Sequence, residues 1–141
     1  MTITTYTQSR WSLADLFPSP DGPEINAAFK SLEEQVAEFE KLRATLSPEI
    51  RSEQFMEIVS QAEKITKLEY RLYGFAELWF TEDTQNQAAQ TLVARIDQLM
   101  AEYSNRTLFF TLWWKSLDEK ESERLMADAG DYRYWLEEMR H

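Results

Sequence analysis

The placement of proline limits the folds open to this 141-residue sequence more than any other feature. All four prolines lie within the first 48 residues, and only three glycines occur in the whole chain. Proline interrupts helices, and tight turns rely on glycine and proline. An all-β domain needs many such turns. The sequence therefore favours long helices after Pro48.

Apolar side chains recur at intervals of three, four and seven residues, which is the spacing of one face of an α-helix. The first series covers residues 25–46, and its helix is predicted to begin at Pro23, because proline is tolerated at the first helical position. The second series covers residues 55–79 and is predicted to lie on a helix over 48–80. Gly74 inside this helix should cost about 1 kcal/mol relative to alanine, and we expect it to permit the close approach of a neighbouring helix.

Further helices are predicted in the second half of the chain. A third long helix is expected from about Ala88, with Ser104 and Asn105 expected to kink or break it. Shorter helical segments are expected over 108–117, 118–129 and 131–139. Because the connecting segments are short, neighbouring helices must run antiparallel.

The predicted fold is all-α, with long antiparallel helices that form a helical hairpin or bundle over residues 23–141. An extended arm is predicted over residues 1–22. Trp11, Leu13 and Phe17 of this arm are expected to dock on the helices.

Composition excludes several classes of function. The net charge of −10 argues against nucleic-acid binding, which needs clustered lysine and arginine, and against anionic membrane surfaces. The chain has no cysteine, and no apolar signal-peptide core is visible near its N-terminus. The longest apolar run is far shorter than the roughly 20 residues of a membrane span. We therefore expect a soluble cytoplasmic protein.

The sequence carries no recognisable catalytic constellation. His141 is the single histidine, and Glu138 precedes it with the E-x-x-H spacing of carboxylate-bridged di-metal sites, which need two such pairs and two further glutamates. Neither HExxH nor G-x-S-x-G occurs. The many carboxylates fit the solvated faces of acidic helices. No catalytic residue, metal ligand or cofactor is assigned, and a carboxylate metal protein is the least favoured alternative.

Large aromatic side chains are concentrated in the last third of the chain. Rings of this size dominate the energetics of cores and interfaces. Adjacent helical positions point about 100° apart, so the pairs 109–110 and 113–114 cannot share one stripe. The rings form either a local core beneath the C-terminal segment or a surface that contacts a further domain or a second copy. The candidate interface or packing residues are Phe109, Phe110, Trp113, Trp114, Tyr132 and Trp135, with Tyr134 in the same cluster.

Four segments of the chain resemble the N-terminal region of oligoendopeptidase F-like zinc metallopeptidases, which are relatives of thimet oligopeptidase. They are WSLADLFPS at 11–19, LYGFAELWFTEDT at 72–84, SNRTLFFTLWWK at 104–115 and ADAGDYRYWLEEMR at 127–140. The resemblance extends over nearly all of the chain, although none of these segments is a catalytic signature.

The resemblance implies a parent enzyme that cleaves short peptides with zinc-activated water. The zinc ligands of that family lie in a later HExxH helix and a following glutamate, and no position here matches them. The chain would then be a non-catalytic N-terminal domain that forms one wall of the substrate channel, with the catalytic domain of the same polypeptide as its partner. The alternative is a stand-alone helical interaction module, either monomeric or homodimeric through its C-terminal aromatic cluster.

Overall fold

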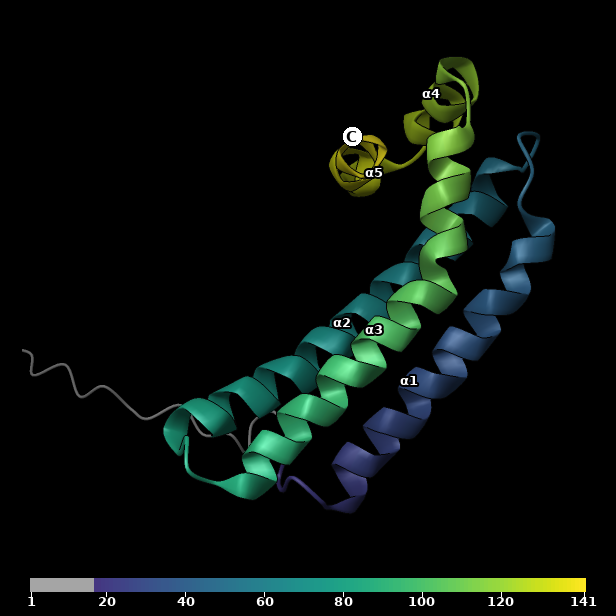
Figure 1. Ribbon diagram of the computed structural model, residues 1–141. Coiled ribbons are helices and arrows are strands. Elements are labelled where there is room, and N and C mark those ends of the chain that lie inside the picture. Colours follow the sequence, from purple (N-terminus) through teal and green to yellow (C-terminus); the bar gives the residue numbers. More distant parts are fainter. Residues whose placement is uncertain (1–16) are drawn as a thin grey trace, which may run out of the picture.

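The computed structural model describes residues 17–141, and their ordered elements are all helical (Figure 1). The α-helices are α1 (Pro23–Lys41), α2 (Ser52–Glu82), α3 (Gln87–Ser116), α4 (Glu119–Ala127) and α5 (Arg133–Arg140). Two short 3-10 helices, η2 (Leu42–Thr45) and η3 (Gly130–Tyr132), follow α1 and precede α5. The predicted all-α helical bundle is confirmed.

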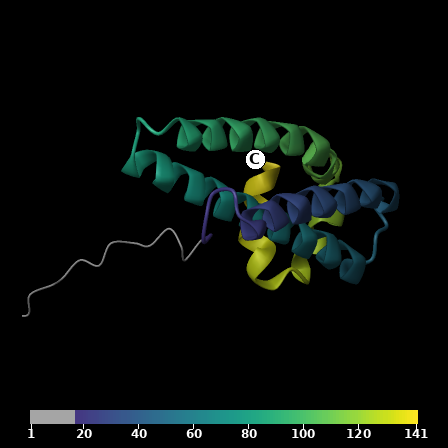
Figure 2. The same cartoon turned by 90° about the horizontal axis from the view of Figure 1, so that it is seen from below.

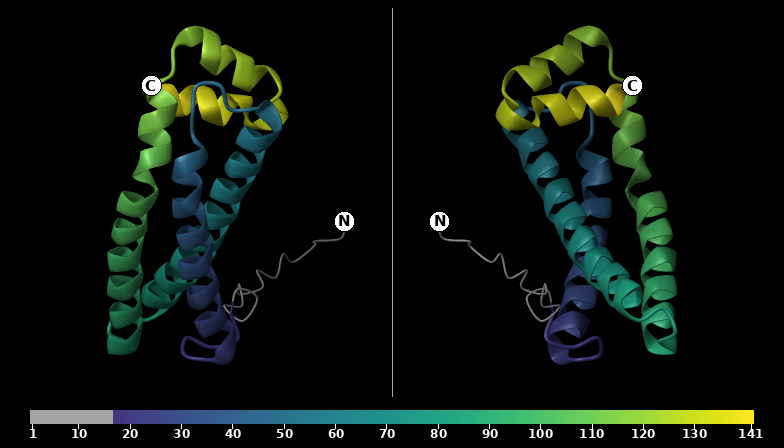
Figure 3. Two further views of the ribbon diagram at one scale, coloured as in Figure 1. Left: turned by 90° about the vertical axis from the view of Figure 1, so that its right-hand side faces the viewer. Right: turned by 90° about the vertical axis from the view of Figure 1, so that its left-hand side faces the viewer.

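The three long helices form the body of the molecule, in which α2 runs antiparallel to α1 and α3 (Figure 1). Figure 2 shows α2 running obliquely to α1 and α3. As a result, α2 and α3 lie close together near their connecting loop and diverge toward the opposite end (Figure 3). The short helices α4 and α5 cross that opposite end, and α5 spans the space between the diverging helices (Figures 1 and 3).

The start of α1 agrees with the sequence prediction, whereas the start of α2 does not. Gly22 is the N-cap of α1 and Pro23 its first residue. The predicted start of α2 at Pro48 is wrong, because the helix begins at Ser52. Residues 47–50 instead form a turn in which the Ile50 amide donates to the Ser47 carbonyl at 3.1 Å.

This turn is held by α4. Arg124 donates to the carbonyl oxygens of Pro48 and Ile50, each at 2.9 Å, and the Ile50 side chain is buried. A helix starting at Pro48 would use the Ile50 carbonyl within its own first turn. Contacts distant in sequence therefore override the local start signal.

Two expectations concern the interior of the long helices, and the one for Gly74 is wrong. A Cβ atom added to Gly74 would meet nothing within 4 Å, so no neighbouring helix approaches closely there. Ser104 and Asn105 are exposed and do not break α3, which continues to Ser116, although Figure 1 shows that the helix bends along its length. Both residues lie on the surface, so a polar pair there leaves the buried face uninterrupted.

The end of the predicted arm that the structure describes packs on α2. Phe17 is buried, its ring meets that of Phe75 edge-on at 5.5 Å, and the Arg71 guanidinium lies 4.3 Å from its centroid. The expected docking of Phe17 is confirmed. Trp11 and Leu13 fall outside the described residues.

Arg106 on α3 fastens that helix to α1. Its Nη1 lies 2.8 Å from a carboxylate oxygen of Glu33, and its Nε donates to Glu40 at 2.8 Å. Hydrogen bonding from Arg106 lowers the pKa of Glu33, and the same bonds raise the pKa of Arg106. Burial raises the pKa of the neighbouring Tyr103 to about 12. These ion pairs hold α3 against α1.

Candidate functional site

The adjacent aromatic pairs of α3 form part of the core at the end where α4 and α5 lie. Phe110 and Trp114 are buried, whereas Phe109 and Trp113 are partly buried. Phe55 of α2 lies 5.2 Å from the ring of Trp114 and 6.2 Å from that of Phe110. These rings therefore join α2 and α3 to each other. They form the local core beneath the C-terminal segment that was one of the two interpretations of the aromatic cluster.

Trp114 also positions α5. Its Nε1 donates to the Leu136 carbonyl at 2.9 Å, so the buried indole has the partner that such a group needs. In return, Arg140 donates to the carbonyls of Trp114 at 2.9 Å and Leu117 at 3.1 Å. The Tyr132 hydroxyl donates to a Glu63 carboxylate oxygen on α2. The short helix α5 is thus held at a defined place across α2 and α3.

The remaining rings of the cluster face solvent. Tyr134 is 72% exposed and Trp135 is 39% exposed. The structure adds two residues that sequence reasoning did not single out, Leu108 and Leu112 on α3, which are 46% and 58% exposed. Their four-residue spacing places both on one face of the helix. That spacing is visible in the sequence but does not reveal which face remains uncovered.

A groove lies between α2, α3 and α5, where the two long helices diverge. It has a volume of about 150 Å³. We call it the α2–α3–α5 groove. Its apolar lining comes from Phe39, Ala62, Ile65, Phe110, Trp135 and Met139, and its polar lining from Thr66, Glu69, Ser104, Thr107 and Thr111.

Glu69 is the charged residue of this lining, and no lysine or arginine lines the groove beside it. It also borders a small apolar pocket with Phe29, Leu72 and Met100. Burial raises the pKa of Glu69. Among residues 17–141 we find no hydrogen-bond or ion-pair partner for its carboxylate. In the sequence, Glu69 occupies a position of the apolar series over 55–79. A carboxylate on an otherwise apolar helical face is the signal by which this residue could have been singled out.

The hydroxyl groups of the groove fall into two sets. Those of Thr66 and Thr107 donate to carbonyls of their own helices, at 3.0 and 2.9 Å. Those of Ser104 and Thr111 make no hydrogen bond within the described part of the chain. The groove therefore offers a carboxylate and two further oxygen atoms to an incoming group.

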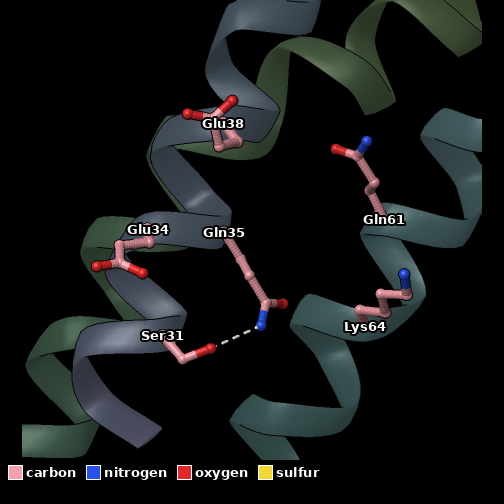
Figure 4. A pocket seen from close by; sticks show the side chains of 6 residues that line it. All are labelled: Ser31, Glu34, Gln35, Glu38, Gln61 and Lys64. Carbon is pink, nitrogen blue, oxygen red and sulfur yellow. Dashed lines mark hydrogen bonds between the residues drawn. The ribbon is translucent and has the colours of Figure 1, made fainter. Parts of the chain in front are cut away.

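A second hollow lies between α1 and α2 and is larger, at about 440 Å³ (Figure 4). Its polar side chains do not converge: Gln35 reaches toward α2, whereas the Glu34 carboxylate points away from it. Most are already paired along their own helix, as with Gln35 Nε2 and Ser31 at 2.9 Å, and Glu38 and Lys41 at 2.8 Å. This hollow resembles an ordinary solvated seam between two helices.

Other kinds of site receive no support from the side chains of residues 17–141. No group of three or more histidine, aspartate or glutamate side chains in this range is arranged to hold a metal ion. His141 is exposed at the end of α5. Over the same range, no helix combines the length and apolar character needed to cross a bilayer.

Searches of protein-family models, curated proteins and solved structures found no match to this chain.

Proposed function

We propose that this helical domain is a non-catalytic part of an oligoendopeptidase F-like zinc endopeptidase of the cytoplasm, which cleaves short peptides. In this proposal the domain packs against the catalytic domain of the same polypeptide and forms one wall of the substrate channel. Zinc and the catalytic groups belong to that other domain. The sequence segments at 72–84, 104–115 and 127–140 support the parentage.

One structural observation carries the docking part of the proposal: large apolar side chains stay exposed on both sides of the α2–α3–α5 groove. On α3, Leu112 follows the groove-lining Thr111, and on α5, Tyr134 precedes the groove-lining Trp135. Full burial of one such side chain contributes about 1.5–3 kcal/mol. Covering the parts of these side chains that are still exposed would therefore favour a contact between domains.

The reading frame directly after the codon for His141 tests the parentage. An in-frame continuation that reaches an HExxH helix would support the proposal, and a natural stop codon there would contradict it. The 141-residue chain by itself is expected to show no cleavage of a quenched fluorescent peptide and no stoichiometric zinc. Peptide cleavage by the purified chain that a chelator abolishes would also contradict it.

The docking surface is tested separately in the full-length polypeptide. Leu112→Glu should weaken the packing of the two domains and speed limited proteolysis between them, since it places a charge in an apolar contact. Glu119→Gln, an exposed change at the start of α4, is the control. Equal proteolysis of both variants would show that this surface does not dock.

A stand-alone interaction module remains the second candidate, because the same exposed side chains would also suit a homodimer. Its test is the mass of the purified chain in solution. A dimer that Leu112→Glu converts to a monomer would favour this candidate. A monomer at all concentrations would exclude it.

A further inference from the structure

We propose that the α2–α3–α5 groove is a binding site for one cationic side chain, a lysine or arginine presented by a polypeptide partner, with Glu69 as its counter-ion. The inference rests on the proposed function only for the source of that side chain, which would be the catalytic domain of the same polypeptide. The chemistry of the site rests on the groove alone.

The size of the groove points to a side chain rather than a whole small molecule. Small-molecule pockets typically measure about 300–1,000 Å³. The groove, at about 150 Å³, is smaller than this range. Its apolar walls, which include Ile65, Phe110 and Met139, suit an aliphatic stem. Lysine and arginine bury such stems along apolar surfaces while their charged ends seek polar partners.

The charge of the groove selects a cation. Glu69 is the charged member of the lining, and no lysine or arginine lines the groove with it. An apolar occupant would bury this carboxylate without a partner, which costs free energy. An anionic occupant would be repelled. A divalent metal ion would need several further oxygen ligands in close array. An ammonium or guanidinium group satisfies the carboxylate with a charge-assisted hydrogen bond.

The other polar groups match the donors of such a cation. Lysine has three N–H donors and arginine has five, and neither side chain accepts. The hydroxyl oxygens of Ser104 and Thr111, which have no partner within residues 17–141, can accept from them. Trp135 lines the groove from α5, and the residue is 39% exposed. An indole face attracts a cation placed within about 6 Å.

The overall charge supports the same occupant. The chain carries 25 acidic and 15 basic residues. A field of this sign attracts basic segments and speeds their encounter with the domain. The association rate and affinity of a basic partner should therefore fall as salt is added.

The test titrates the purified 141-residue chain with N-acetyl-arginine amide and N-acetyl-lysine amide, and follows amide and indole signals by NMR. We expect saturable shifts at Glu69, Ser104 and Trp135 with a Kd on the order of millimolar. N-acetyl-glutamine amide, which has no charge, should not saturate these shifts. Glu69→Gln should weaken binding of the cationic probes by about tenfold or more, which corresponds to about 1.4 kcal/mol.

Glu57→Gln is the matched control, because Glu57 is exposed on α2 outside the groove and the change in net charge is the same. It should leave the affinity within about twofold, since exposed charges are screened. A second readout in the wild-type chain is the pKa of Glu69, which should fall when a cationic probe binds. Three results would each overturn the inference: absence of saturable shifts, equal binding of the neutral probe, or equal losses in Glu57→Gln and Glu69→Gln.

These results are separable from those of the proposed function. A stop codon after His141 would remove the peptidase parentage and leave probe binding unaffected. Absence of probe binding would remove the cationic site and leave the parentage standing.

Discussion

Gly74→Ala should stabilise the protein, contrary to the role that the sequence suggests for this glycine. Gly74 lies in the interior of the 31-residue helix α2, and an added Cβ would have no neighbour within 4 Å. Alanine therefore encounters no steric cost there. It gains the helix propensity difference between glycine and alanine, which is about 0.8–1.0 kcal/mol. Most of the gain arises because alanine has less backbone freedom to lose on folding.

The measurement is urea denaturation followed by circular dichroism, with thermal unfolding as a second method. The free energy of unfolding should rise by about 1 kcal/mol, and the melting temperature by about 3–4 °C for a chain of this length. The slope of the urea transition should stay unchanged, since the surface exposed on unfolding is the same.

Gly130→Ala supplies the opposite control within the same chain. Gly130 also has open space around its missing Cβ, but its φ of +54° lies in the left-handed region. Alanine in that conformation costs about 1–2 kcal/mol, so this variant should be destabilised. If Gly74→Ala also lowered the free energy of unfolding, the added Cβ would have to meet a neighbour in solution. That result would refute the reasoning from open space.

Three further predictions concern the polar contacts. Trp114→Phe removes the N–H that donates to Leu136 and should lower the free energy of unfolding by about 1–3 kcal/mol, measured with urea; an unchanged value would show that the bond contributes nothing. Glu69→Gln should stabilise the chain at pH 7, because burial raises the pKa of this carboxyl. That gain should vanish as the pH falls below about 4.3, where the unfolded carboxyl is protonated as well; a gain independent of pH would contradict it. Arg106→Gln should destabilise the chain above about pH 4.3. The difference from wild type should shrink as the pH falls through the lowered pKa of Glu33, which urea titrations at several pH values would detect.

The periodic features of the sequence were sufficient to predict the class of fold. Proline confined to the first 48 residues left long uninterrupted stretches, and the apolar spacing identified the faces that became the core. Local end signals were less informative. Ser47 and Pro48 read as a helix start, but the hydrogen bonds of Arg124 to this turn come from a residue more than 70 positions away.

The candidate site could be anticipated only in part. The aromatic cluster was visible in the sequence, but its division into buried Trp114 and exposed Trp135 depends on where α5 crosses the bundle. Glu69 within an apolar series was a usable signal. The groove itself was not predictable, because it exists where α2 and α3 diverge, and that geometry results from packing among helices distant in sequence.

Arg140 gives the C-terminal end of α3 a mechanical dependence on α5. The last carbonyls of a helix lack the usual i+4 amide partners, and Arg140 donates to two of those at the end of α3, Trp114 and Leu117. Pulling α5 away would break the Trp114 indole hydrogen bond and both Arg140 bonds at the same time, and the Trp114 carbonyl would keep only the Leu117 amide at 3.4 Å. The last turn of the 30-residue helix α3 would then fray, so displacing the eight-residue helix α5 would loosen the end of one of the two longest helices of the molecule.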